Sequence, residues 1–122
     1  MDQFNVNGAL AVRLLERMKG GEAERVPHAT QEELRGFQPE ASKCHENVNR
    51  WCAENPGHRP LRGWIVTSTL FDKHSVVDRG AGGLLDITPL RDRSHTDFLR
   101  HMGSQEEFDS FPAQVIAVDF NP

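Results

Sequence analysis

The chain has 122 residues, of which 14 are Lys or Arg and 18 are Asp or Glu, and its formal net charge is −4 when the histidines are neutral. This length suits a single domain over residues 1–122, and no apolar run reaches the roughly 20 residues that a membrane span requires. An acidic balance without a basic cluster argues against nucleic-acid binding, because attraction to phosphate is the main contribution to that affinity. The N-terminal residues show no secretory signal, so we expect a cytoplasmic protein, or one exported without a visible signal peptide.

Two segments in the first third of the chain have helical signatures. Leu and Ala recur at three- and four-residue spacing over residues 8–18, which predicts a helix that ends at Gly20-Gly21. Residues 30–33 read Thr-Gln-Glu-Glu, the form of a capping box, and predict a short helical turn over residues 31–35. The rest of residues 21–40 is polar and contains two prolines, and no strand is predicted there.

A further helix is predicted from Ser42, a favourable N-cap, to Asn55, where Asn-Pro-Gly stops it. One face of this helix carries residues at helical spacing: Cys44, Val48, Trp51 and Cys52. Cys44 falls in the first turn, where unpaired backbone N–H groups and the helix dipole favour the thiolate. Cys52 is predicted as a core residue. The helical rise puts the two cysteines about 12 Å apart, which is too far for a disulfide.

The second half of the chain has the composition of strands. Strands are predicted over residues 61–71, 74–78, 84–88 and 114–118, because β-branched and aromatic residues gather there between turn residues. A short helix capped by Ser94 or Thr96 and a turn over residues 105–108 are predicted between the last two strands. The expected fold class is α+β, with N-terminal helices packed on an antiparallel sheet of about four strands.

The turn at Gly80 brings two titratable side chains together. If residues 74–78 and 82–86 pair as an antiparallel hairpin centred on Gly80, His74 lies opposite Asp86. The Cβ atoms of opposed residues are about 4.5–5.5 Å apart, so the carboxylate can accept a hydrogen bond from the imidazole. Such a bond fixes the tautomer and stabilises the imidazolium. A cysteine at a helix start, followed by His and Asp on successive strands, is the arrangement that covalent acyl transfer needs.

The order Cys44, His74, Asp86 resembles the papain-like cysteine hydrolase superfamily in its transglutaminase-like and NlpC-like branches. The resemblance covers roughly residues 36–90 and rests on residues 44–48 (CHENV), Gly63-Trp64, residues 74–77 (HSVV) and residues 83–89 (GLLDITP). It implies a papain-like core in which Cys44 is the nucleophile, His74 the general base and acid, and Asp86 the residue that orients His74. Gln38 is similar in position to the oxyanion glutamine of papain-like peptidases. His45 departs from the family, which usually has an aromatic residue after the cysteine.

The resemblance implies a small hydrolase or acyltransferase that acts on an amide or thioester carbonyl of a protein or peptide-like substrate, without cofactor or metal. Asn47, one turn after Cys44, is a candidate for holding the substrate carbonyl, or else an anchor for a loop. The same residues also allow a non-catalytic binding domain, in which Cys44 is an inert core thiol.

A zinc site is the other alternative, with Cys44, His45, His74 and Asp86 as ligands. Neighbouring residues of a helix point about 100° apart, which makes joint ligation by Cys44 and His45 awkward. The remaining histidines are predicted to lie on the surface: His28, His58, His95 and His101.

Overall fold

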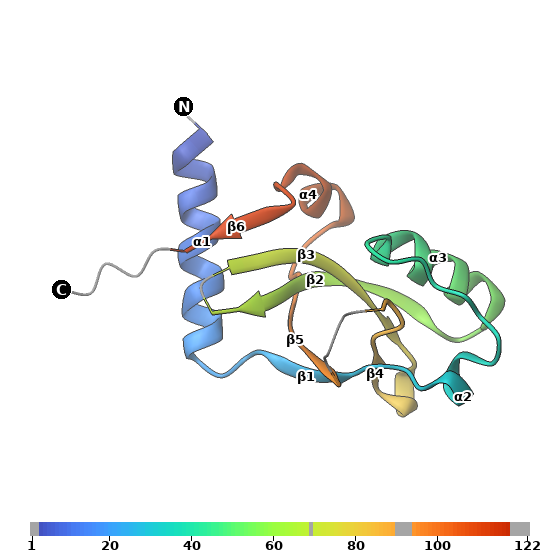
Figure 1. The fold of residues 1–122 in the computed structure, drawn as a ribbon. Coiled ribbons are helices and arrows are strands. Elements are labelled where there is room, and N and C mark those ends of the chain that lie inside the picture. Colours follow the sequence, from blue (N-terminus) through green and yellow to red (C-terminus); the bar gives the residue numbers. More distant parts are fainter. Residues whose placement is uncertain (1–2, 69, 90–93, 118–122) are drawn as a thin grey trace.

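The computed structural model describes residues 3–68, 70–89 and 94–117 (Figure 1). Four α-helices and a six-stranded antiparallel sheet are present in these residues, which confirms the α+β class. The elements are α1 (Gln3–Lys19), β1 (Glu24–Pro27), α2 (Gln31–Leu34), α3 (Cys44–Glu54), β2 (Arg59–Thr67), β3 (Leu70–Asp78), a 3-10 turn (Gly80–Gly82), β4 (Leu84–Leu85), β5 (His95–Arg100), α4 (Gln105–Ser110) and β6 (Gln114–Ile116).

The predicted count of about four strands was too low, because two strands lie in segments that had other signatures. Strand β1 falls in the polar stretch, where Val26 is the buried residue. Strand β5 occupies the segment predicted as a short helix. Its Thr96 and Phe98 are fully buried at two-residue spacing, and this burial overrides the capping preference of Ser and Thr. The turn predicted over 105–108 is the first part of helix α4, and Val118 of the predicted last strand lies outside the described residues.

The predicted helices are present with shifted ends. Helix α1 extends to Gln3 on its N-terminal side. The capping box at α2 is confirmed: the Thr30 hydroxyl accepts a hydrogen bond from the Glu33 N–H at 3.1 Å, and the Glu33 carboxylate accepts one from the Thr30 N–H at 2.9 Å. Helix α3 begins at Cys44 with Lys43 as N-cap, because Ser42 adopts a left-handed backbone with φ of 63° and cannot cap it.

The sheet curls until its two outer strands meet. Its strand order is β1-β5-β2-β3-β4, and β6 also pairs with β3. Just after β1 and β4 the chain forms a parallel bridge between His28 and Asp86: the Asp86 N–H donates to the Pro27 carbonyl at 2.9 Å, and the Ala29 N–H donates to the Asp86 carbonyl at 2.9 Å. Figure 1 shows β1 and β4 close together beneath β2 and β3. The sheet therefore has an inner face and an outer face.

The inner face has an apolar layer next to a polar layer. Val26, Val76 and Phe98 form a buried cluster, with Leu61 and Leu84 packed against it. Alternate residues of a strand share a face. The residues two positions away from the members of this apolar cluster therefore also lie on the inner face, and they form the second, mostly polar layer: His28, Gly63, His74, Asp86 and Thr96. Gly63 is required there, since a Cβ at this position would overlap the Leu99 carbonyl oxygen and lie 2.5 Å from Cζ of Phe98.

Helices cover the outer face. Helix α1 packs Leu10 and Leu14 into a core with Trp64, Phe71 and Phe108, and α3 packs Val48 and Trp51 into a second core with Val77, Leu85 and Ile87. Figure 1 shows α1 and α3 at opposite ends of β2 and β3. The middle of β3 lies between these two cores, and it carries the residues described next.

Candidate active site

Strand β3 has a gap in its pairing where helix α3 begins. On one edge β3 pairs with β6 through residues 70–72 and with β4 through residues 77–78, so residues 74–76 lie between the two partners. Helix α3 packs against β3, and its first two side chains, Cys44 and His45, interact with His74 and Ser75 at this gap. The chain therefore brings the cysteine helix and the histidine strand together, as the sequence pattern predicted.

Cys44, His74 and Asp86 lie in series, with a hydrogen bond between His74 and Asp86 and electrostatic coupling between Cys44 and His74. His74 Nε2 donates to Asp86 Oδ2 at 2.7 Å, with His74 3% and Asp86 1% exposed. This bond leaves His74 Nδ1 for the Cys44 thiol, whose pKa responds to both His74 and His45. The structure thus joins all three residues that the sequence singled out as nucleophile, base and orienting acid.

Electrostatics in this series favours the thiolate–imidazolium pair. Burial by itself raises the pKa of Cys44, but the adjacent His45 and His74 rings, as donors and as charges, outweigh it and lower that pKa to about 6. Burial would lower the pKa of His74, but its bonds to Asp86 and Cys44 and their negative charges raise it to about 9. Between these two values the sulfur is negative and the ring positive.

The predicted hairpin register was wrong by two residues, yet the predicted contact is made. Val77 pairs with Leu85 and Asp78 with Leu84, whereas the assumed register put Asp78 opposite Gly82. A shift of two residues keeps every side chain on its original face, because strand side chains alternate with a period of two. Strand β4 then ends at Leu85, and Asp86 turns inward to the bridge with His28. His74 and Asp86 therefore still share the inner face.

Three further groups hold the Asp86 carboxylate. The Thr96 hydroxyl donates to Oδ2 at 2.6 Å, the Thr88 N–H donates to Oδ1 at 3.0 Å, and His28 Nε2 lies 3.6 Å from Oδ2. Since the Thr96 hydrogen is directed to Asp86, His28 Nε2 donates to Thr96 Oγ1, at 2.8 Å. Burial raises the pKa of Asp86, but these bonds and the His74 charge lower it overall. His28 was predicted on the surface and is part of this network instead.

A second series of hydrogen-bonded polar side chains begins at His45, the residue after Cys44. His45 Nδ1 bonds to the hydroxyl of Ser75, which also accepts from Arg62 Nη1 at 2.8 Å. The Arg62 guanidinium donates further to Asn49 Oδ1 at 2.8 Å and to Gln105 Oε1 at 3.1 Å. Burial lowers the pKa of Arg62, and the nearby charge of Cys44 opposes that effect. Sequence reasoning considered His45 as a zinc ligand only and did not single out Ser75 or Arg62.

The backbone at the start of α3 offers N–H groups that have no acceptor within the helix. The first helical hydrogen bond runs from the Asn47 N–H to the Lys43 carbonyl at 2.9 Å, and the Lys43 side chain forms no cap. The N–H groups of residues 44–46 therefore have no acceptor within the helix. Such donors beside a thiolate can hold a developing negative charge.

The other two predicted site residues lie in different surroundings. The carbonyl of Gln38 accepts from Arg50 Nη2 at 3.0 Å, and Gln38 lines a hollow together with Phe37 and Trp51. Asn47 is fully buried. Its amide bonds to both backbone groups of Glu40, at 2.8 and 2.9 Å, and donates to Thr88 Oγ1 at 3.1 Å. These bonds give Asn47 the anchoring role that was the alternative to holding a substrate.

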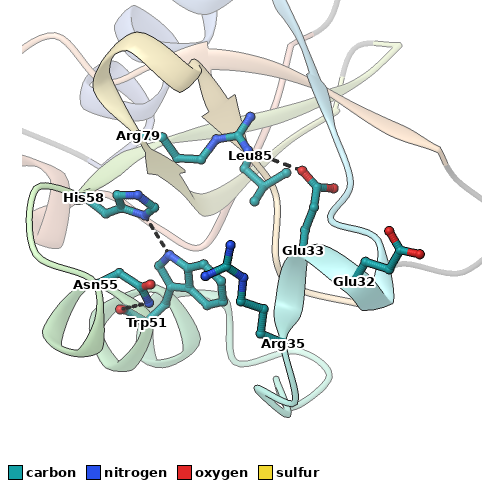
Figure 2. Close-up of a pocket in the computed structure, with 8 residues that line it drawn as sticks. All are labelled: Glu32, Glu33, Arg35, Trp51, Asn55, His58, Arg79 and Leu85. Atoms are coloured by element: carbon teal, nitrogen blue, oxygen red, sulfur yellow. Dashed lines mark hydrogen bonds and ion pairs between the residues drawn. The ribbon is translucent and has the colours of Figure 1, made fainter.

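A separate hollow of about 560 Å3 lies at the other end of α3 (Figure 2). Trp51 and Leu85 line it, and two pairs of its polar side chains are hydrogen-bonded: Trp51 Nε1 donates to His58 Nδ1 at 2.9 Å, and Arg79 Nη1 donates to Glu33 Oε2 at 3.3 Å. The residues that line it do not include Cys44, His74 or Asp86. This hollow is therefore distinct from the cysteine site.

Within residues 3–68, 70–89 and 94–117, no group of three His, Cys, Asp or Glu side chains is arranged to hold a metal ion. The helices of the same residues are too short or too polar to cross a membrane. Comparison of the chain with protein-family models, with curated proteins and with solved structures found no match.

Proposed function

We propose that the protein is a small cysteine hydrolase or acyltransferase, related in its arrangement to papain-like enzymes, that acts on an amide or thioester carbonyl of a protein or peptide-like substrate. The observation that carries this proposal is the series from Cys44 through His74 to Asp86, with its 2.7 Å bond between His74 and Asp86. A thiol with its pKa lowered to about 6 is largely ionised at neutral pH, and the thiolate is the nucleophilic form.

The reaction follows from the roles of these groups. The Cys44 thiolate attacks the carbonyl carbon, a C–S bond forms and the carbonyl oxygen becomes an oxyanion. The oxyanion collapses, the bond to the leaving group breaks, and the His74 imidazolium gives its Nδ1 proton to the departing nitrogen or sulfur. In the second half, water or an amine attacks the thioester carbonyl while His74 accepts its proton, and Cys44 leaves as thiolate. Asp86 holds the ring through Nε2 in both halves.

The backbone donors support the charged intermediate. The Cys44 N–H lies on the nucleophile residue itself and has no helical acceptor. It provides one donor to the oxyanion, and the positive end of the α3 dipole adds to it. The choice between hydrolysis and transfer then depends on which acceptor reaches the thioester.

Acylation by p-nitrophenyl acetate tests this proposal. We expect release of one p-nitrophenolate per protein in a rapid first phase, with the mass of one acetyl group on the peptide that contains Cys44. Cys44→Ala should abolish the phase, and Cys52→Ser is the matched control that should keep it. Acetyl groups found elsewhere, or a first phase that persists in Cys44→Ala, would refute the proposal. Added amines then distinguish transfer from hydrolysis.

A further inference from the structure

A second imidazole lies beside the Cys44 sulfur, and the steps above assign it no role. His45 follows Cys44 in the first turn of α3, lies close enough to lower the pKa of the thiol, and binds Ser75 through Nδ1. Its ring also meets Phe108 edge-on, with 5.8 Å between the centroids and 84° between the planes. The His45 ring is therefore held on two sides while it stays next to the reacting atom.

The Ser75 hydroxyl favours one tautomer of His45. Arg62 can only donate, and it occupies one acceptor position of the Ser75 hydroxyl. The hydrogen of this fully buried hydroxyl is then available to His45 Nδ1. A neutral ring that accepts at Nδ1 carries its own hydrogen on Nε2, and a charged ring carries hydrogens on both nitrogens. Nε2 of His45 is thus a donor in either state.

The Nε2–H donor of His45 is also oriented before the reaction begins. Arg62, which holds Ser75, is itself held by Asn49 and Gln105, so the support of His45 reaches α3, β2 and the start of α4. A donor that is already oriented when charge develops stabilises the transition state without a cost of reorganisation. A mobile surface side chain would not have this property.

We propose that His45 is the side-chain donor to the oxyanion in acyl transfer at Cys44, acting beside the backbone N–H of Cys44. This inference rests on the proposed function and adds a catalytic residue to it. His45 takes the place that the resemblance gave to Gln38, whose carbonyl is bound to Arg50 on a different part of the molecule. When the thiolate attacks, Nε2–H of His45 donates a hydrogen bond to the carbonyl oxygen. The ring keeps its proton, and the bond weakens again when the oxyanion collapses.

Two reactions of the same sulfur separate this role from a general effect on the thiol. Alkylation by iodoacetamide occurs at a saturated carbon and forms no oxyanion, whereas acylation by p-nitrophenyl acetate forms one. Each rate is taken from the plateau above the thiol pKa of that variant, so that a changed pKa does not enter the comparison. His45→Ala should lower the acylation rate about 100-fold or more and leave the alkylation rate within about threefold.

Three variants complete the experiment. His45→Gln keeps a side-chain N–H and should restore part of the acylation rate. Ser75→Ala removes the group that orients the ring and should lower acylation with a smaller effect than His45→Ala. His58→Ala changes a histidine bound to Trp51 at the far end of α3 and should leave both rates unchanged.

The outcomes distinguish this inference from the function on which it rests. Acylation of His45→Ala at the wild-type rate, or an equal loss in both reactions, would overturn the role of His45. Wild-type protein that is not acylated at Cys44 would overturn the proposed function instead. If His45→Ala does not fold, Ser75→Ala decides, because a folded Ser75→Ala that keeps the wild-type acylation rate, or that loses both rates equally, contradicts the donor role.

Discussion

Replacing His74 with Gln should raise the pKa of Cys44 and thereby suppress its reactivity at neutral pH. Gln keeps a neutral N–H donor for Asp86 but carries no positive charge to stabilise the thiolate. The wild-type pKa of about 6 arises from two imidazoles acting against burial. With one of them lost, the pKa should move toward the ordinary value of 9.

The expected size of the effect follows from the ionised fraction. At pH 7 a thiol with pKa 6 is about 90% thiolate and one with pKa 9 is about 1% thiolate, which bounds the loss at roughly 100-fold. Since His45 still stabilises the thiolate, the loss of alkylation rate in His74→Gln should fall between about tenfold and about 100-fold.

The assay is the rate of iodoacetamide labelling from about pH 4 to about pH 10, resolved by mass spectrometry for each cysteine. In the wild type, labelling of Cys44 should rise through pH 6 as the thiol loses its proton. Cys52 is an internal control, because burial raises its pKa and it should label slowly at neutral pH in both proteins. A wild-type midpoint near pH 9, or the same midpoint in His74→Gln, would refute the electrostatic reasoning.

Two further substitutions test residues that shape the site without reacting. Asn47→Ala removes the buried amide that pairs with both backbone groups of Glu40, so the free energy of unfolding should fall by about 1–3 kcal/mol while the labelling midpoint of Cys44 stays unchanged. Gly63→Ala forces a methyl group against the Leu99 carbonyl and should lower the free energy of unfolding by about 2–3 kcal/mol. Both are measured by urea unfolding.

Each of these two substitutions is compared with a second variant. Asn47→Asp keeps an acceptor for the Glu40 N–H but places an oxygen against the Glu40 carbonyl, so it should destabilise the protein as well. If Asn47→Ala is as stable as wild type but acylates slowly, Asn47 serves the substrate and the anchoring role is wrong. Gly8→Ala adds a methyl group in α1 where no atom lies within 4 Å, and it should not destabilise the protein. Equal effects at Gly8 and Gly63 would contradict the packing account.

Sequence patterns predicted those features of the site that depend on residues close together in the chain. The spacing of Cys44, Val48 and Trp51 identified the helix and its buried face, because helical periodicity is a property of neighbouring residues. The contact between His74 and Asp86 was predicted from a wrong register, and it holds since a two-residue shift preserves the face.

The residues that were missed are brought in by long-range pairing. Thr96 reaches Asp86 from β5, whose alternation of buried Thr96 and Phe98 is a strand signal that the capping preference of Ser and Thr obscured. His28 reaches the site because the outer strands of the sheet meet, and no local pattern encodes that closure. His45 was visible at its position, but its partner Ser75 depends on how α3 sits on β3.

The bridge between His28 and Asp86 makes the ionisation of Cys44 depend on correct folding of the sheet. Asp86 reaches its position only when the chain after β4 joins the end of β1, a contact between distant parts of the sequence that forms at a high entropic cost. Without Asp86 in place, His74 loses a main source of its positive charge, and Cys44 loses the partner that ionises it. A chain in which this bridge has not formed therefore carries an ordinary thiol at Cys44, and the reactive thiolate is present only when the sheet has closed.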